Sequence, residues 1–205
     1  MESRKKSIIC TVLISVIMLI GAYVYAHIDK MQMLYDESLD TSTYIATGNV
    51  GLGIVEQTFL CKEKSLDGMN VKCQLFGDVT NVILKYQLFE EETDVAVAKG
   101  ELAAAEIKNG QFNKLVFGEK VINTKGKKYT FQMQGVNVSE QQGVGFCYEN
   151  KVEEGAKLSV AEEEIRGTLI AKTVTKRFDM ETFVVVVSFI VFIWAFFKVL
   201  YKLFK

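Results

Sequence analysis

Two long apolar runs, one near each end of the chain, constrain the fold most. Ser7 to Ala26 is a run of 20 residues without a charged side chain, and Thr182 to Tyr201 contains a single charge, Lys198. About 20 apolar residues in a helix rise roughly 30 Å, the thickness of the hydrocarbon core of a bilayer. Neither run carries the polar stripe that is typical of surface helices in soluble proteins. The sequence therefore predicts a transmembrane helix at each end.

The first run also fits a cleavable signal peptide. Val24 and Ala26 are small residues at the two positions that matter before a cleavage site. The run is long for the apolar region of a signal peptide, which spans about 7–15 residues, and this favours an uncleaved anchor. Both alternatives export the domain that follows.

The charged flanks predict the orientation. Arg4, Lys5 and Lys6 precede the first run, and Lys202 and Lys205 follow the second. Basic flanks stay in the cytoplasm, so both termini are expected there and the central domain outside the cell membrane. The expected organisation is a cytoplasmic N-terminus (1–6), a transmembrane helix or signal peptide (7–26), a stalk (27–48), an extracytoplasmic β-sandwich (49–178), a transmembrane helix (182–201) and a cytoplasmic C-terminus (202–205).

The hydrophobic period changes along the central part of the chain. Ile28, Met31, Leu34 and Tyr35 keep the spacing of a helix face, which predicts that the first helix continues as a stalk to about Leu39. Further on, apolar and polar residues alternate, as in half-buried strands. This alternation predicts strands at 69–75, 82–88, 129–133 and 144–148, with weaker candidates at 54–62, 94–99, 111–117 and 168–175.

Glycine-containing turns are expected between the strands. They are Leu66-Asp67-Gly68, Phe76-Gly77-Asp78, Lys108-Asn109-Gly110, Thr124-Lys125-Gly126 and Gln142-Gly143; one helical turn is an alternative at 103–107. Short strands separated by such turns indicate a mainly β fold, an antiparallel β-sandwich of the jelly-roll kind, flanked by the two transmembrane helices. Proline is absent, so strand edges must be protected by glycine, asparagine and charge.

Few residues in the chain suit catalysis. The one histidine, His27, lies at the outer end of the first apolar run, away from any motif that would pair it with a nucleophile. No phosphate-binding loop or zinc motif is present, and a net charge of −1 argues against binding to nucleic acid. We therefore expect a protein without enzymatic activity, metal or cofactor, and a carboxylate-based hydrolase is the enzyme class left open.

Three cysteines belong to the exported domain. In a hairpin centred on Asp67, Cys61 and Cys73 lie opposite each other, close enough for a disulfide. The alternative is that these two and Cys147 are small apolar side chains packed in the sandwich, which an odd number of cysteines favours.

Two acidic runs, Glu90-Glu91-Glu92 with Asp94 and Glu162-Glu163-Glu164, resemble metal-binding sequences only superficially. Consecutive carboxylates in a strand point to opposite faces, whereas calcium needs six to eight converging oxygens. We expect these runs to be solvated edges.

Several segments between residues 54 and 149 resemble a known family. They are Glu56-Gln57-Thr58-Phe59, Leu66-Asp67-Gly68-Met69-Asn70-Val71, Asn81 to Leu88, and Asn123 to Phe131. Together they resemble a poorly characterised group of Gram-positive bacterial membrane proteins with a jelly-roll extracytoplasmic domain, which often accompanies surface-polysaccharide or cell-envelope machinery. The resemblance implies this fold and this setting.

The functional expectation is an accessory or interaction subunit of a cell-envelope assembly, with the lipid bilayer and either a protein or a surface glycan as partners. One alternative is a membrane-tethered carbohydrate-binding module, although most aromatic residues lie at positions expected in the core. Another is a regulator of polysaccharide chain length, a class similar in its two spans but with a helical exported domain.

Overall fold

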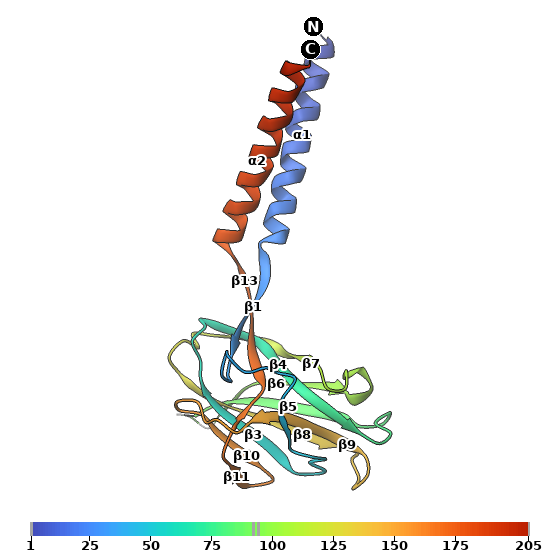
Figure 1. Ribbon diagram of the computed structural model, residues 1–205, viewed down its shortest axis with the longest axis vertical. Helices are drawn as coiled ribbons and strands as arrows, with labels where there is room; N and C mark the ends of the chain where they lie inside the picture. The colour runs from blue at the N-terminus through green and yellow to red at the C-terminus, as the bar shows by residue number, and fades with distance from the viewer. Residues whose placement is uncertain (1, 92, 94, 205) are drawn as a thin grey trace. The chain divides into compact units, whose positions relative to one another are not determined.

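The computed structural model describes residues 2–91, 93 and 95–204, and these form two units. The helical unit combines the two ends of the chain, up to Asp29 and from Lys176 onward, and the β unit comprises Lys30–Thr175. Figure 1 labels the helices and strands. The described residues form α1 (Glu2–Tyr25), β1 (His27–Met33), β2 (Ile45–Ala46), β3 (Ile54–Leu60), β4 (Ser65–Phe76), β5 (Ile83–Glu90), β6 (Val95–Ala103), β7 (Phe112–Ile122), β8 (Lys128–Val136), β9 (Gly143–Glu149), β10 (Lys157–Val160), β11 (Glu163–Ile165), β12 (Thr168–Leu169), β13 (Ala171–Phe178) and α2 (Met180–Leu203).

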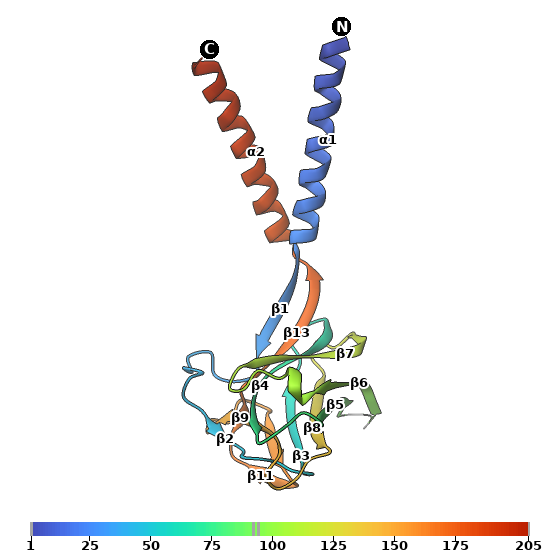
Figure 2. The ribbon, with the colours of Figure 1, turned by 90° about the vertical axis from the view of Figure 1, so that its right-hand side faces the viewer.

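The strands form two antiparallel sheets, so the fold is mainly β and sandwich-like. The order in the six-stranded sheet is β11-β10-β3-β8-β5-β6. The seven-stranded sheet has the order β1-β13-β4-β9-β12, with β7 added beside β4 and β2 beside β9. The strands β1 and β13, which lead to the two helices, lie side by side at one edge of this sheet (Figure 2).

The core consists of the inward faces of both sheets. Along β8, Tyr129, Phe131 and Met133 are buried, while the residues between them are partly exposed. The ring of Phe131 lies 6.2 Å from that of Tyr86 in β5 and 6.1 Å from that of Phe117 in β7, so it joins the two sheets. Burying a side chain of this size contributes about 1.5–3 kcal/mol.

A buried polar residue also joins the sheets. Gln57 in β3 is fully buried, and its Oε1 accepts a hydrogen bond of 2.8 Å from the backbone N–H of Leu169 in β12. Its Nε2 donates to the carbonyls of Thr58 and Lys157. The side-chain amide is therefore satisfied on both sides, as a buried polar group must be.

All eight strands expected from the sequence are confirmed, with the last candidate divided between β12 and β13. The helical turn is also present, as a short 3-10 helix at Ala104–Glu106. Glycines with positive φ close three of the expected turns, at Gly77, Gly110 and Gly126, whereas Gly143 is the first residue of β9. The strands that the sequence did not indicate are β1, β2, β10 and β11.

The prediction that the first helix continues as a stalk is wrong. The helix ends at Tyr25, and His27–Met33 is strand β1, which pairs with β13. Leu34 continues this pairing, since its N–H donates to the carbonyl of Ala171 at 3.0 Å. Hydrogen bonds to a distant strand therefore override the local helical spacing of Ile28 and Met31, both of which are exposed.

The prediction of a hairpin centred on Asp67 is wrong too. Leu66-Asp67-Gly68 lies inside β4, where the ladder with β7 is interrupted by a bulge. Cys61 and Cys73 are consequently not facing residues of one hairpin: Cys73 pairs with Phe146 of β9, and Cys61 donates its N–H to Lys127. In the structure Cys61, Cys73 and Cys147 are free, buried thiols, the arrangement that the packing alternative expects.

The terminal helices differ in how well they fit a membrane. Within the described residues, α2 is the helix that is long and apolar enough to cross a bilayer, and none of that stretch is buried. Asp179 caps its start, because its carboxylate accepts hydrogen bonds from Glu181 N–H and the Thr182 hydroxyl. The apolar part described for α1, Val12–Tyr25, is shorter, and a membrane span there stays a prediction.

Candidate functional site

A surface hollow follows the terminal strand of the six-stranded sheet. This hollow, which we call the edge groove, has a volume of about 790 Å³. Among the described strands, β6 pairs with β5 alone and β7 pairs with β4 alone, so each is the last strand of its sheet on this side. The side chains that line the edge groove include those of Lys85, Gln87, Val97, Lys99, Glu101 and Glu119.

A bulge in β7 forms one wall of the edge groove. Leu66 is opposite Val121, but Gly68 is opposite Val116 instead of residue 119, the position that a regular ladder would give. The extra residues bring Gly118 beside β6, where a Cβ on it would lie 3.5 Å from the carbonyl oxygen of Lys99. Bulges of this kind commonly reshape a sheet edge near a binding site.

Tyr86 fixes the floor of the edge groove. Its hydroxyl donates a hydrogen bond of 2.7 Å to the carbonyl of Val116 in β7, and its ring covers Gly100 of β6. Burial raises the pKa of the Tyr86 phenol, so this group stays a neutral donor. It therefore holds the two sheet edges together and does not serve as a nucleophile.

The exposed side chains of the edge groove carry both charges. On neighbouring strands Lys85 is opposite Glu101, and Gln87 is opposite Lys99. Opposite charges facing each other across strands stabilise a sheet by about 0.2–1 kcal/mol. Together with a terminal strand, they also offer polar and charged groups to an extended segment of another molecule.

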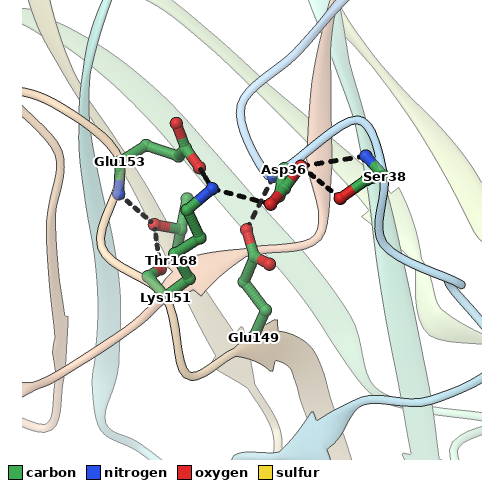
Figure 3. Close-up of polar contacts among 6 residues, drawn as sticks. All are labelled: Asp36, Ser38, Glu149, Lys151, Glu153 and Thr168. Atoms are coloured by element: carbon green, nitrogen blue, oxygen red, sulfur yellow. Dashed lines mark hydrogen bonds and ion pairs between the residues drawn. The ribbon is translucent and has the colours of Figure 1, made fainter.

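The second hollow, of about 600 Å³, contains a polar cluster. Lys151 Nζ lies 2.6 Å from Asp36 Oδ2 and 3.3 Å from Glu153 Oε1 (Figure 3). Asp36 also accepts hydrogen bonds from the N–H and hydroxyl of Ser38, and its own N–H donates to Glu149 Oε1 at 2.7 Å. The cluster ties the segment after β1 to the end of β9 and the loop that follows it.

The electrostatics of this cluster are those of a structural ion pair. Hydrogen bonds from Lys151 and Ser38 hold the pKa of Asp36 well below its usual value, and Asp36 in turn raises the pKa of Lys151. A general acid or base that works near neutral pH needs a pKa near 7. Both groups move away from that range, so the cluster fastens the chain and does not suit proton transfer.

The sequence-predicted candidates are dispersed. The thiols of Cys73 and Cys147 are kept protonated because burial raises their pKa values, that of Cys147 to about 11. His27 lies in the helical unit, where its Nδ1–H donates a hydrogen bond of 2.8 Å to the Tyr23 carbonyl. Within the described part of the chain, no group of three or more histidine, cysteine or acidic residues could hold a metal ion.

Where the structure describes them, the residues of the acidic runs are exposed except Glu90, whose side chain is 14% exposed. Glu90 pairs with Lys127, Glu91 with Lys128, and Glu164 with Lys157. Glu92 and Asp94 lie outside the described residues.

The aromatic side chains of the β unit are buried or only partly exposed where the structure describes them. Among its described residues, the large apolar side chains that are well exposed are aliphatic: Met31, Met33, Ile45, Leu52, Ile54, Leu60, Val95, Val116, Ile122 and Val152, together with Ile28 just before it. Stacking against a sugar ring requires an exposed aromatic face.

Comparison with known proteins identifies no family. No family model matches the chain, and no curated protein matches it. Over 72% of its length, the chain aligns with a structure of the cysteine protease and lectin-like domains of Cwp84, a surface layer associated protein of Clostridium difficile, at 9% identity and a TM-score of 0.38. It also aligns with the VP2 subviral particle of infectious bursal disease virus, at 9% identity and a TM-score of 0.26. The chain spans 36% and 40% of these two chains, and neither similarity is close enough to support a functional argument.

Sequence reasoning missed the edge groove. The alternation of polar residues in β5 and β6 was visible, but the register that places Lys85 beside Glu101 is set by long-range pairing. The available signal for the edge groove was the nine-residue strand β6, which carries one positive and one negative side chain, Lys99 and Glu101, near its centre.

Proposed function

We propose that this protein is a membrane-anchored, jelly-roll-like β-sandwich outside the cell membrane, and that it acts as a non-enzymatic interaction subunit of a cell-envelope assembly. The observation that carries this proposal is the edge groove, which runs along the terminal strand β6 and is walled by the β7 bulge. A strand with one unpaired side is a site where a partner's extended segment can add to the sheet.

The membrane location is supported by α2, which is apolar, uncovered and long enough to span. The uncharged run from Ser7 to Ala26 and the basic residues at both ends of the chain support a second span and cytoplasmic termini. The loose resemblance to Gram-positive envelope proteins supports the cellular setting.

A protein partner fits the edge groove better than a glycan does. Lys99 and Glu101, which line the edge groove, present opposite charges within three residues. In the described residues of β6 and β7, the well-exposed large apolar side chains are aliphatic, namely Val95, Val116 and Ile122. Complementary charges on a protein can match this pattern and select the partner.

Photo-crosslinking in the membranes of the native cell tests this proposal. A crosslinking amino acid replaces Gln87 in the edge groove, and a second variant carries it at Lys157, an exposed position on β10 toward the opposite edge of the same sheet. We expect one protein adduct from position 87, and none from position 157. Lys99→Glu combined with Gln87 crosslinking should reduce the yield several-fold.

Three results would count against the interaction subunit. One is equal adducts at both positions, and another is a monomer alone after purification in mild detergent. The third is a polysaccharide adduct at position 87, which would favour the tethered carbohydrate-binding module.

A further inference from the structure

Two loops of the β unit form a basic surface around an exposed isoleucine. Residues 61–64 follow β3, and residues 123–127 follow β7. The loops are joined by hydrogen bonds: Thr124 Oγ1 donates to the Glu63 carbonyl at 2.7 Å, and the Gly126 N–H donates to the Cys61 carbonyl at 2.8 Å. Lys62, Lys64 and Lys125 are exposed, and Ile122 at the end of β7 is 65% exposed.

Two further contacts place these loops next to the points where the chain leaves the β unit. The Thr175 hydroxyl donates to the Ser65 carbonyl, and the Gln32 side chain accepts from the Lys62 N–H at 3.0 Å. Since α2 begins at Met180, five residues after Thr175, an extended chain of this length reaches at most about 17 Å. The basic loops therefore belong to the part of the β unit from which the chain leads into α2.

The composition of this surface matches the headgroup region of a membrane. Lysines attract the phosphates of anionic lipids, and an exposed aliphatic side chain among them adds apolar burial at the interface. Lys30, Lys176 and Arg177 add positive charge along the connecting chain, against Asp29 and Glu63. In the helical unit, Tyr23, His27 and Phe178 form a ring cluster with centroids 4.5–5.4 Å apart, the kind of aromatic group that occupies membrane interfaces.

We propose that the basic surface, formed by Lys62, Lys64 and Lys125 around Ile122, docks on the anionic phospholipid headgroups of the bilayer that α2 enters. This inference is independent of the edge groove and rests on the membrane location alone. It assigns a role to positive charges that lie on the exported side of the membrane, where the usual charge bias does not require them.

Fluorescence in nanodiscs tests the docking. The full chain carrying Ile122→Cys is labelled with a polarity-sensitive fluorophore. The background labelling is measured on the chain without this substitution, in which Cys61, Cys73 and Cys147 are buried. It is compared in discs of zwitterionic lipid and in discs that also contain phosphatidylglycerol. We expect a blue shift and several-fold slower aqueous quenching in the anionic discs, and loss of both in Lys62→Gln/Lys64→Gln/Lys125→Gln and at high salt, where the screening length falls to about 3 Å at 1 M.

The matched control carries the fluorophore at Leu52→Cys. Leu52 is 72% exposed and precedes β3, whereas the basic surface follows that strand, so about 20 Å separates the two positions. Its spectrum should not respond to lipid charge. Incorporation into the discs reports the membrane anchor separately from the docking.

Equal spectra of the Ile122→Cys label in both lipids, or an equal response at Leu52, would overturn the proposal. Protection produced in neutral discs by inorganic phosphate would also overturn it, in favour of a soluble anion site. The same effect from a soluble anionic polymer would point to a cell-wall ligand instead.

Discussion

At the scale of single residues, the Asp36–Lys151 ion pair shows how this sandwich holds a long irregular segment. Residues 34–44 lack regular secondary structure. Asp36 contacts Lys151, Glu149 and Ser38, and these contacts fix the beginning of the segment. The pair is largely open to solvent, so its contribution to stability is small and depends on pH.

The pH dependence follows from the direction of each shift. The pKa of Asp36 in the folded protein is below the ordinary value, so its ionised form stabilises the fold at neutral pH, and this contribution is lost as the pH falls through the folded-state pKa. The pKa of Lys151 is raised, so its contribution is present at neutral pH and is lost as the pH rises through that raised value.

Asp36→Asn should therefore lower the melting temperature slightly at pH 7. The difference from the wild type should begin to shrink as the pH falls below about 4, because Asp36 of the unfolded chain then takes up a proton, and it should vanish as the pH falls through the lower pKa of the folded protein. Thermal unfolding of the full chain in detergent across this pH range measures the effect. Glu154→Gln, which removes an exposed carboxylate of the same region, serves as the control, and an equal loss there would show that Asp36 has no special role.

At the scale of elements, β4 explains the main error of sequence reasoning. Asp-Gly is a strong turn signal, but Gly68 is opposite both Val116 of β7 and Val174 of β13. A Cβ at this position would lie 2.3 Å from the carbonyl oxygen of Leu115, a backbone atom that cannot move away. Glycine is required here by close approach of a neighbouring strand and not by a turn.

Gly68→Ala and Gly68→Asn should each reduce the free energy of unfolding by about 1–3 kcal/mol, the usual cost of overpacking a core. If Gly68 closed a turn, asparagine would be tolerated there. Gly126→Asn is the matched control, because Gly126 has a φ of +82° and no atom within 4 Å of its Cβ position. Denaturant titration compares the stability of the three variants. If Gly68→Asn were as stable as the wild type, the result would support the interpretation that Gly68 closes a turn.

The strands that sequence patterns found are those with one buried face. In β5 and β8 the buried residues, such as Leu84 and Phe131, alternate with partly exposed ones, and this alternation is local information. Strand β1 has no buried face, and β10 and β11 are short, so each depends on a partner far along the chain. The candidate sites depend on such partners as well: Asp36 and Lys151 are 115 positions apart.

At the scale of the whole molecule, the edge groove requires a compromise between solubility and binding. A terminal strand that is exposed invites unwanted pairing, and charges on it are a common protection. Lys99 and Glu101 supply this protection on β6, while the β7 bulge restricts access from the other sheet. On the proposed function, we expect the edge groove to bind a partner that neutralises both charges and not an uncharged strand.

The number of membrane spans decides where this module works. The helix α1 extends from Glu2 to Tyr25, and Ser7–Ala26 is uncharged over 20 residues, which is about 30 Å as a helix. The apolar stretch Val12–Tyr25 alone would reach roughly 21 Å, which is short of the hydrocarbon core. The two lengths make opposite predictions for a chain that lacks α2.

We expect a chain truncated after Asp179 to remain in the membrane fraction, with its new C-terminus outside the cell, because the longer uncharged run of α1 serves as an anchor. A compartment-sensitive reporter fused to that end should be active outside, whereas the same reporter after residue 205 of the full chain should be active in the cytoplasm. Mass spectrometry of the mature N-terminus is the control for cleavage. Release of the truncated chain with an intact N-terminus would show that α2 alone holds the protein, and release after cleavage near Ala26 would establish a signal peptide.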